Sequence, residues 1–388
     1  MSAERRGVVV ILPDDYERTT LPDVEGAFGH MHLDVMSDVS RLEAPRAGAP
    51  EAGVRTLRRV GVVVADAERS EEVAKYYSEV PGAAVLEDRR VRAYPSVVDA
   101  VAVALGDSPT ETWARTALNL GGCRWTGRGA KVAVLDSGYA SAHPDFAGRP
   151  VATAVFNGAP SPGDLYGHGT HCLGLVGGPA VPSRGPRYGV APNASLYVGK
   201  VLGDDGQGWI SDVLTGLNWA LAQGCDVVSL ALGWQDDDPA QVAGFETVAS
   251  RALARGCLIV AAAGNESARP ALVSPVSFPA SAPSVLAVAA LDTDLSVDIR
   301  SNRGSAGGPQ IDLAAPGAAM WSTWPQATYQ TADGTSMATS FVAGVAALWK
   351  ESSPSLGGRS LWAAMTAASA KLPYSSEDVG AGLVQAPS

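Results

Sequence analysis

Short apolar runs alternate with longer stretches of helical periodicity from residue 131 to the end of the chain. The apolar runs have the length of buried parallel strands, and the clearest are Lys131–Leu135, Asp226–Leu230, Leu258–Ala261 and Val285–Val288. Residues 211–223 carry apolar positions at helical spacing, which predicts an amphipathic helix. This alternation predicts an α/β fold in which helices flank a parallel sheet. Ligands of such sheets bind at the carboxyl ends of the strands, so we expect the chemistry there.

A different pattern precedes residue 95. Apolar runs at Gly7–Ile11, Gly61–Val64 and Ala84–Leu86 predict strands, and a helix is expected to begin at Ser70. Strands and a helix mixed over this length indicate a small α+β domain. We therefore expect three parts: an α+β domain over residues 1–94, a linker over residues 95–111 and an α/β domain over residues 112–388.

The 388-residue chain has the composition of an ordinary globular protein, with 46% hydrophobic and 18% charged residues. Its formal net charge is −11 and its basic residues do not cluster, which argues against nucleic acid and anionic membranes as partners. No apolar run is long enough to cross a bilayer, and the N-terminal run lacks the features of a signal peptide. These features predict a cytoplasmic location and no membrane partner.

Three glycine-bounded blocks carry an Asp, a His and a Ser, in that order along the chain: Val134–Gly138, Gly167–His171 and Gly334–Ala338. A serine hydroxyl is a poor nucleophile unless a base lies within hydrogen-bond reach, and that base needs an acidic partner to fix its tautomer. A fourth block, Ala261–Glu266, supplies an amide side chain that can hold a developing oxyanion. The candidate catalytic residues are therefore Asp136, His168, Ser336 and Asn265.

The four blocks together resemble the signatures of subtilisin-like serine peptidases, the subtilase family, and the resemblance extends from about Thr112 to the C-terminus. It implies a subtilisin-like sheet and a serine endopeptidase that hydrolyses peptide or protein substrates through an acyl-enzyme. It also assigns the role of general base to His168 rather than to the nearby His171. This chemistry requires no cofactor.

The N-terminal domain resembles a subtilase propeptide, which folds the enzyme and inhibits it. Val85–Tyr94 in particular resembles the end of such a propeptide, whose last residues lie in the substrate cleft. The resemblance therefore implies a zymogen in which the chain's own N-terminal domain is an intramolecular inhibitor.

The same resemblance assigns the substrate-binding residues. It makes Gly206, Gln207, Gly208 and Trp209 an edge strand that pairs with an extended peptide. It places the walls of the S1 pocket at Leu230, Ala231, Leu232 and Gly233 and at Ala263 and Gly264, with Ser277 near the floor. Because no acidic residue is expected at this floor, an apolar or aromatic P1 side chain is favoured. Trp234 is assigned either to the mouth of the pocket or to a surface loop.

Metal binding receives little support from the sequence. The four cysteines form no C-x-x-C pair, so we assign no metal ligand. Cys225 and Cys257 each open an apolar run, and we expect buried free thiols there rather than a disulfide bridge between them. Asp145 matches a subtilase position that can ligate calcium. Residues 178–189, however, lack the asparagine-bearing pattern of the strong calcium site, so calcium is only weakly supported.

Two alternatives to a broad zymogen peptidase stay open at this point. One is a self-inhibited subtilase whose uncleaved N-terminal domain acts as a binding or regulatory module. The other is a dedicated peptidase that matures one precursor.

The bond between Tyr94 and Pro95 lies where a subtilase propeptide is expected to be cut. Proline fixes φ and supplies a tertiary leaving nitrogen, so we predict that this bond stays intact. Processing then falls between about Ser96 and Thr112, or does not occur. Mass spectrometry of the mature protein checks this, and an N-terminus at Pro95 would contradict it.

Overall fold

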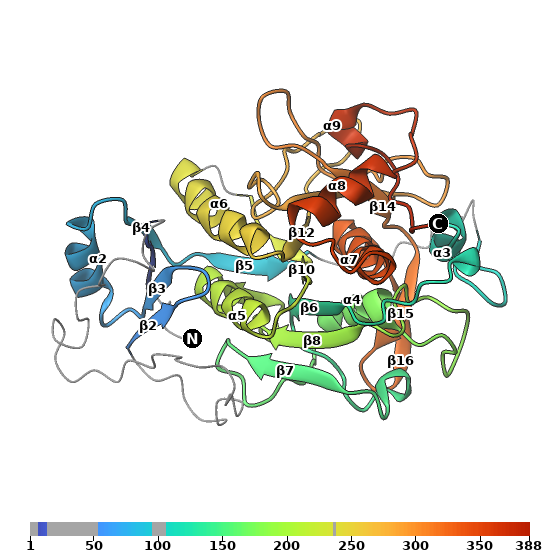
Figure 1. Cartoon of the computed structure of the whole chain (residues 1–388), viewed down its shortest axis with the longest axis horizontal. Helices are drawn as coiled ribbons and strands as arrows, with labels where there is room; N and C mark the ends of the chain where they lie inside the picture. Colours follow the sequence, from blue (N-terminus) through green and yellow to red (C-terminus); the bar gives the residue numbers. More distant parts are fainter. Residues whose placement is uncertain (1–6, 14–52, 95–105, 236–237) are drawn as a thin grey trace.

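The structure is a computed structural model that describes residues 7–13, 53–94, 106–235 and 238–388. Its larger body contains a seven-stranded parallel sheet in the order β14-β13-β12-β10-β6-β8-β7 (Figure 1). These strands are β6 (Lys131–Asp136), β7 (Val151–Val155), β8 (Ser195–Lys200), β10 (Val227–Leu230), β12 (Leu258–Ala262), β13 (Leu286–Leu291) and β14 (Leu313–Pro316). The predicted α/β fold class is confirmed.

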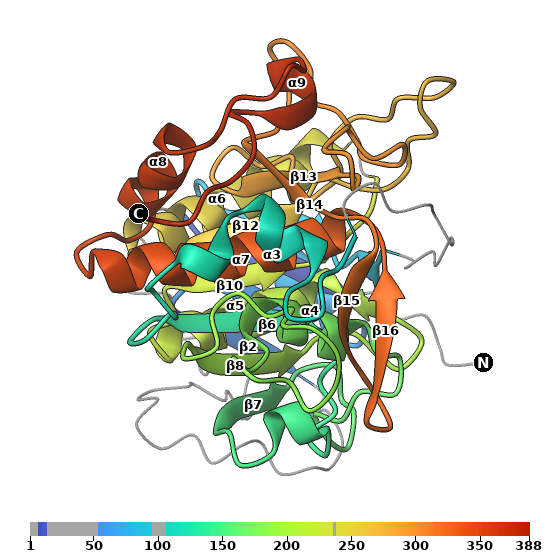
Figure 2. The ribbon, with the colours of Figure 1, turned by 90° about the vertical axis from the view of Figure 1, so that its right-hand side faces the viewer.

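Helices pack against this sheet, and Figure 2 shows α7 near the middle of the body beside β10 and β12. The helices of the body are α3 (Trp113–Ala117), α4 (His168–Gly177), α5 (Ile210–Ala222), α6 (Pro239–Ala254), α7 (Thr335–Ser352), α8 (Arg359–Ala367) and α9 (Ser376–Val379). Residues 335–348 of α7 are all buried, as its run of small apolar residues predicts. Among the described residues, no helix combines the length and hydropathy needed to cross a bilayer.

The helices α4 and α7 lie side by side in the same direction. Cys172 lies against Ser340, and a Cβ added at Gly344 would be 3.0 Å from the carbonyl oxygen of Val176. Cys172 and Ser340 each lie four residues after the candidate residues His168 and Ser336. This parallel register brings the first turns of the two helices together.

The N-terminal unit is an antiparallel sheet with one described helix. The sheet has the order β2-β3-β1-β4 and comprises β1 (Val8–Ile11), β2 (Val54–Leu57), β3 (Val62–Ala65) and β4 (Ala84–Glu87), with α2 (Ser70–Ser78) packed on it. Sequence reasoning missed β2, in which two polar residues separate Val54 from Leu57, so that it has neither alternation nor a continuous apolar run. Residues 95–105 of the predicted linker lie outside the described residues, so the proposed boundaries stay a prediction.

The N-terminal unit contacts the body through α5 and α6. Arg251 of α6 donates to the carbonyl oxygens of Leu12, Val60 and Gly61. Asp88 accepts hydrogen bonds from the backbone N–H and the hydroxyl of Ser211 in the first turn of α5. A carboxylate at a helix N-terminus satisfies N–H groups that have no partner within the helix. The unit is therefore held against the two helices by polar as well as apolar contacts.

Two smaller sheets complete the described structure. One contains β5 (Arg90–Ala93) between β9 (Gln207–Trp209) and β11 (Leu232–Gly233). The other is a hairpin of β15 (Met320–Trp324) and β16 (Thr328–Ala332), which the sequence reading did not predict. The four cysteines are free, as expected.

Candidate active site

Asp136 and His168 form the buried ion pair of the site. Asp136 is the last residue of β6, and His168 is the first residue of α4 after Gly167, whose φ is 98°. Nδ1 of His168 lies 2.9 Å from each carboxylate oxygen of Asp136. Burial opposes protonation of this imidazole, but the charge of Asp136 and its hydrogen bond outweigh burial and raise the pKa of His168 well above its usual value.

A second carboxylate, Asp164, holds the start of α4 in place. It accepts hydrogen bonds from the backbone N–H groups of Gly167 and Thr170 and from the hydroxyls of Thr170 and Ser137. The Ser137 hydroxyl in turn accepts from the N–H of Gly169. Sequence reasoning missed Asp164. The available signal was an acidic residue three positions before the glycine that begins the helix.

His171 lies in the same helix but is held in a different role. Its Nε2 is 2.9 Å from the carbonyl oxygen of Met320 and 3.1 Å from that of Gln330. Burial and the neighbouring His168 lower the pKa of His171 to about 4, so the ring is neutral and donates to the β15–β16 hairpin. Its ring therefore joins α4 to this hairpin.

Ser336 lies in the first turn of α7, with its side chain 1% exposed. Its hydroxyl donates to the carbonyl oxygen of Ala231 at 3.0 Å. Nε2 of His168 is buried and has no hydrogen-bond partner in the described part of the chain. The two residues begin helices that pack side by side, and a hydrogen bond between a nucleophile and its base is often long or poorly aligned before substrate binds.

Asn265 follows β12, and hydrogen bonds to its side-chain oxygen fix its orientation. Oδ1 accepts from the backbone N–H of Thr335 at 2.9 Å and from its hydroxyl at 2.8 Å. Because Oδ1 is held by these donors, the amide nitrogen faces the other way, close to Gly334. Its two N–H donors are thus placed beside the start of α7, one residue from Ser336.

Strand β5 of the N-terminal part runs antiparallel between the two predicted substrate-binding strands. It pairs Arg90, Val91 and Arg92 with Trp209, Gly208 and Gln207 of β9, and Ala93 and Arg92 with Leu232 and Gly233 of β11. The N–H of Ala93 also donates to the carbonyl oxygen of Gly206 at 2.8 Å. The N-terminal segment β5 therefore contacts the whole predicted edge strand Gly206–Trp209 and two residues, Leu232 and Gly233, of one predicted pocket wall.

Tyr94 follows β5 and fills a slot beside Gly233, with its hydroxyl toward Ser277 and Glu266. The side chain is 1% exposed, and a Cβ at Gly233 would lie 2.6 Å from its hydroxyl oxygen. Gly264 has φ of 111°, and a side chain there would collide with Ser277 and Asn302. A side chain at Gly233 would therefore collide with Tyr94, and the predicted pocket residues Leu230, Ala263 and Ser277 are buried.

The expectation of a pocket without an acidic residue is wrong. Glu266, next to Asn265, has its Oε2 3.0 Å from the Ser277 hydroxyl and 2.7 Å from the amide nitrogen of Asn302. Burial and the Glu266 carboxylate raise the pKa of Tyr94, so the phenol stays neutral and faces Ser277 and Glu266. The reading overlooked Glu266 because Ser277 and Asn302, which orient it, are distant in sequence.

Trp234, next to Gly233, is partly exposed and packs on Phe278. Its backbone exchanges two hydrogen bonds with Phe278, at 3.0 and 3.1 Å, and the two rings lie 4.3 Å apart between centroids. The neighbouring Gln235 donates to the Ser277 hydroxyl at 2.9 Å. Residues 236–237 of the adjoining loop lie outside the described residues.

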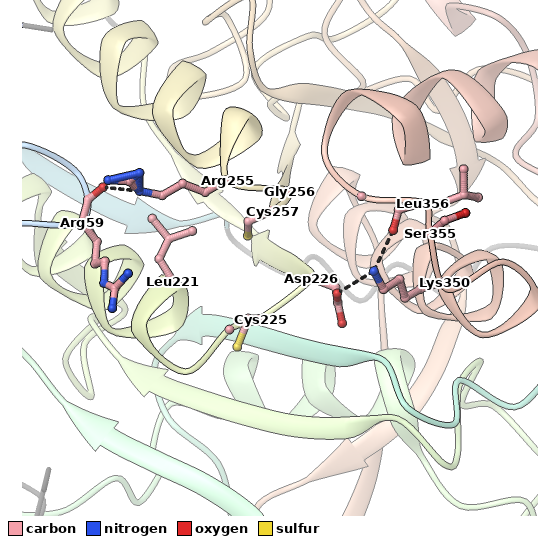
Figure 3. A pocket seen from close by; sticks show the side chains of 12 residues that line it. Arg59, Leu221, Cys225, Asp226, Arg255, Gly256, Cys257, Lys350, Ser355 and Leu356 are labelled. Carbon is pink, nitrogen blue, oxygen red and sulfur yellow. Dashed lines mark hydrogen bonds and ion pairs between the residues drawn. The ribbon is translucent and has the colours of Figure 1, made fainter. Parts of the chain in front are cut away.

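A cavity of about 750 Å³ lies at the opposite edge of the sheet, where Cys225 and Cys257 precede β10 and β12 (Figure 3). Within it Lys350 pairs with Asp226 at 3.1 Å, and Arg255 donates to the carbonyl oxygen of Arg59. Asp136 and Asn265 are at the carboxyl ends of their strands, so this cavity is separate from the candidate catalytic residues.

Comparisons with known proteins agree with this geometry. Residues 127–382 match the model of the Subtilase family. The chain is 44% identical to Subtilisin BL of Lederbergia lenta over 232 residues, which are 59% of this chain and 79% of that protein. Subtilisin Savinase of the same organism matches at 43% with the same coverage. Subtilisin E of Bacillus subtilis (strain 168) matches at 40% over 58% of this chain and 56% of its own length.

Removing the Asn265 amide tests its contribution to peptide hydrolysis. We expect Asn265→Ala to lower kcat by about 10²–10³ with little change in KM, the loss found when a subtilisin loses its oxyanion amide. Ser336→Ala should lower kcat by about 10⁶. Asn193→Ala, at the opposite edge of the sheet, is the control. Steady-state kinetics on one peptide substrate would contradict the assignment if Asn265→Ala matched the control.

The raised pKa of His168 predicts the acid limb of the pH profile. A base with a raised pKa loses its neutral form earlier as pH falls, so kcat/KM should decline below an apparent pKa higher than that of an ordinary histidine. Asp136→Asn removes the charge that raises this pKa and leaves burial, so its acid limb should move to lower pH while kcat falls about 10⁴-fold. The exposed carboxylate variant Asp294→Asn is the control. An unmoved limb in Asp136→Asn argues against the pairing.

Proposed function

Because this chain belongs to the subtilase family and is a serine endopeptidase, we propose that it is a zymogen that cleaves after aromatic residues, tyrosine above all. The observation that carries this proposal is Tyr94, which is buried beside Gly233 at the end of the antiparallel strand β5. An extended substrate bound in the same way pairs with β9 and β11 and inserts its P1 side chain into the slot.

The proposed reaction uses the four candidate catalytic residues in the roles that the resemblance gives them. Ser336 Oγ attacks the carbonyl carbon while His168 Nε2 takes its proton, and Asp136 stabilises the imidazolium that forms. The side-chain amide of Asn265 and the backbone N–H of Ser336 donate to the oxyanion. Protonated His168 then gives its proton to the leaving amine, and water hydrolyses the acyl-enzyme by the same steps in reverse.

The polar end of the slot supports tyrosine as the preferred P1 residue. A ring fills the apolar part, and the Tyr94 hydroxyl faces Ser277 and Glu266. Oε1 of Glu266 accepts no hydrogen bond in the described part of the chain, so it is an acceptor available to a P1 hydroxyl. An acidic P1 side chain would bring a second carboxylate beside Glu266, which is unfavourable in a buried site. The specificity therefore follows from one carboxylate.

The contacts of the N-terminal unit support intramolecular inhibition. Strand β5 uses both backbone edges that a substrate needs, so the two compete directly. The unit is also held outside the cleft by Asp88 on α5, by the ion pair of Arg89 with Asp238 at 3.1 Å and by Arg251. A binding segment tethered in this way has a high effective concentration and inhibits without needing high intrinsic affinity.

A self-inhibited enzyme with an uncleaved N-terminal domain is a second candidate, and one observation favours it. Pro95 follows Tyr94 in the sequence, so the bond next to the filled slot is a poor substrate. Strand β5 then occupies the cleft like a product that offers no cleavable bond. In this case a partner or another protease releases the domain.

Peptides that differ only at P1 test the specificity. We expect kcat/KM to follow Tyr ≥ Phe > Leu, with P1 Glu far below. Glu266→Gln should raise the value for P1 Glu by at least about tenfold, since like-charge contacts cost several kcal/mol. Asp294→Asn, which changes an exposed carboxylate outside the cleft, should leave the order unchanged. An unchanged P1 Glu value in Glu266→Gln would argue against the role of this carboxylate.

A further inference from the structure

Asp145 is a nearly buried carboxylate that receives three hydrogen bonds. It lies in the 3₁₀ helix η3 (Pro144–Phe146) and is 7% exposed. The backbone N–H of Ser183 donates to Oδ1 at 2.7 Å, and the hydroxyls of Tyr188 and Tyr329 donate to Oδ2 at 2.6 and 2.9 Å. These bonds join three segments that are distant in sequence: η3, the loop at residues 183–188 and strand β16.

The groups around Asp145 do not fit a calcium ion, although the family resemblance gives this position to a calcium ligand. Calcium binds six to eight oxygen lone pairs. Here an N–H and two O–H groups point their hydrogens at the carboxylate, which is where a cation would have to sit. Among the described residues, the one cluster of three His, Cys, Asp or Glu side chains able to hold a metal is Asp136, His168 and Cys172. Asp145 therefore belongs to no such cluster among the described residues.

Neighbouring rings reinforce the same arrangement. His143 accepts from the N–H of Asp145 through Nδ1 and contacts the carbonyl oxygen of Thr328 through Nε2 at 2.9 Å, so Nε2 carries the proton. The Tyr329 ring stacks on Trp321 with an interplanar angle of 6° and meets His143 edge-on. These contacts fix the Tyr329 hydroxyl toward Asp145.

We propose that Asp145, Ser183, Tyr188 and Tyr329 form a hydrogen-bonded lock that takes the place of calcium, so that folding stability at this site does not depend on the ion. The lock is the carboxylate and its three donors. A carboxylate that accepts several hydrogen bonds from neutral donors keeps its charge without a cation, and these bonds lower the pKa of Asp145 against the effect of burial.

The lock is connected to α4, the helix that begins with His168, through the β15–β16 hairpin. Gln330, next to Tyr329, offers its carbonyl oxygen to His171. The hydroxyls of Ser322 and Thr323 in β15 donate to the carbonyl oxygens of His171 and Thr170 in α4. The hairpin that the lock holds therefore also supports the helix that carries His168.

Thermal unfolding with and without calcium tests the lock on the full chain. Ser336→Ala is used throughout so that the protein does not digest itself. We expect the same Tm, within about 1 °C, after dialysis against EDTA and after addition of about 5 mM CaCl₂. A calcium-dependent rise in Tm that disappears in the double variant with Asp145→Asn would overturn the proposal, because Asp145 would then be a calcium ligand.

Two conservative variants test the donors. Tyr188→Phe and Tyr329→Phe each remove one hydroxyl from a charged hydrogen bond and should lower Tm by about 2–8 °C. Tyr374→Phe, at an exposed tyrosine, is the matched control and should leave Tm unchanged. If both variants have the same Tm as the control, the two hydroxyls do not stabilise the fold and the proposal fails. If a variant does not fold, the calcium comparison on unaltered Asp145 still decides.

Discussion

The close parallel packing of α4 against α7 is the constraint on which the active site depends. His168 and Ser336 begin these helices, and Gly344 allows the two backbones to approach near Val176. A larger residue at Gly344 would separate the helices and, with them, the base and the nucleophile. The parallel sheet adds the remaining groups, because Asp136 and Asn265 follow strands that end at the same edge. The packing of α4 against α7 thus brings the first residues of these two helices close to the ends of β6 and β12.

A second consequence concerns the N-terminal unit. The cleft has two open backbone edges, and β5 closes both of them in one sheet with β9 and β11. The sheet of the N-terminal unit rests on α5 and α6, and this contact places β5. Asp88 accepts a hydrogen bond from Ser211 in the first turn of α5, and Arg251 of α6 donates to the carbonyl oxygen of Leu12. Under the proposed function, this strand and the Tyr94 ring occupy the place that a substrate needs.

Much of this arrangement was predictable because short contiguous segments of the sequence encode it. Buried parallel strands are apolar throughout, and the glycine-bounded blocks at their ends carry the chemistry, so the fold and the candidate catalytic residues could be inferred before the structure. The missed features depend on contacts between distant segments. Asp164 is oriented by hydrogen bonds from Ser137 and Thr170, and Glu266 by hydrogen bonds from Ser277 and Asn302. Tyr329 of β16 bonds to Asp145, which is distant in sequence. The weak strand β2 is recognisable only by its pairing with β3.

The most direct test of the account is the intact mass of the wild-type chain beside Ser336→Ala, followed over time with a fluorophosphonate that labels reactive serines. An occupied cleft predicts that full-length wild type resists the label. Label should appear only on molecules that have lost the N-terminal unit, while Ser336→Ala stays full-length and unlabelled. Rapid labelling of the full-length wild type would contradict the claim that β5 and Tyr94 occupy the substrate cleft.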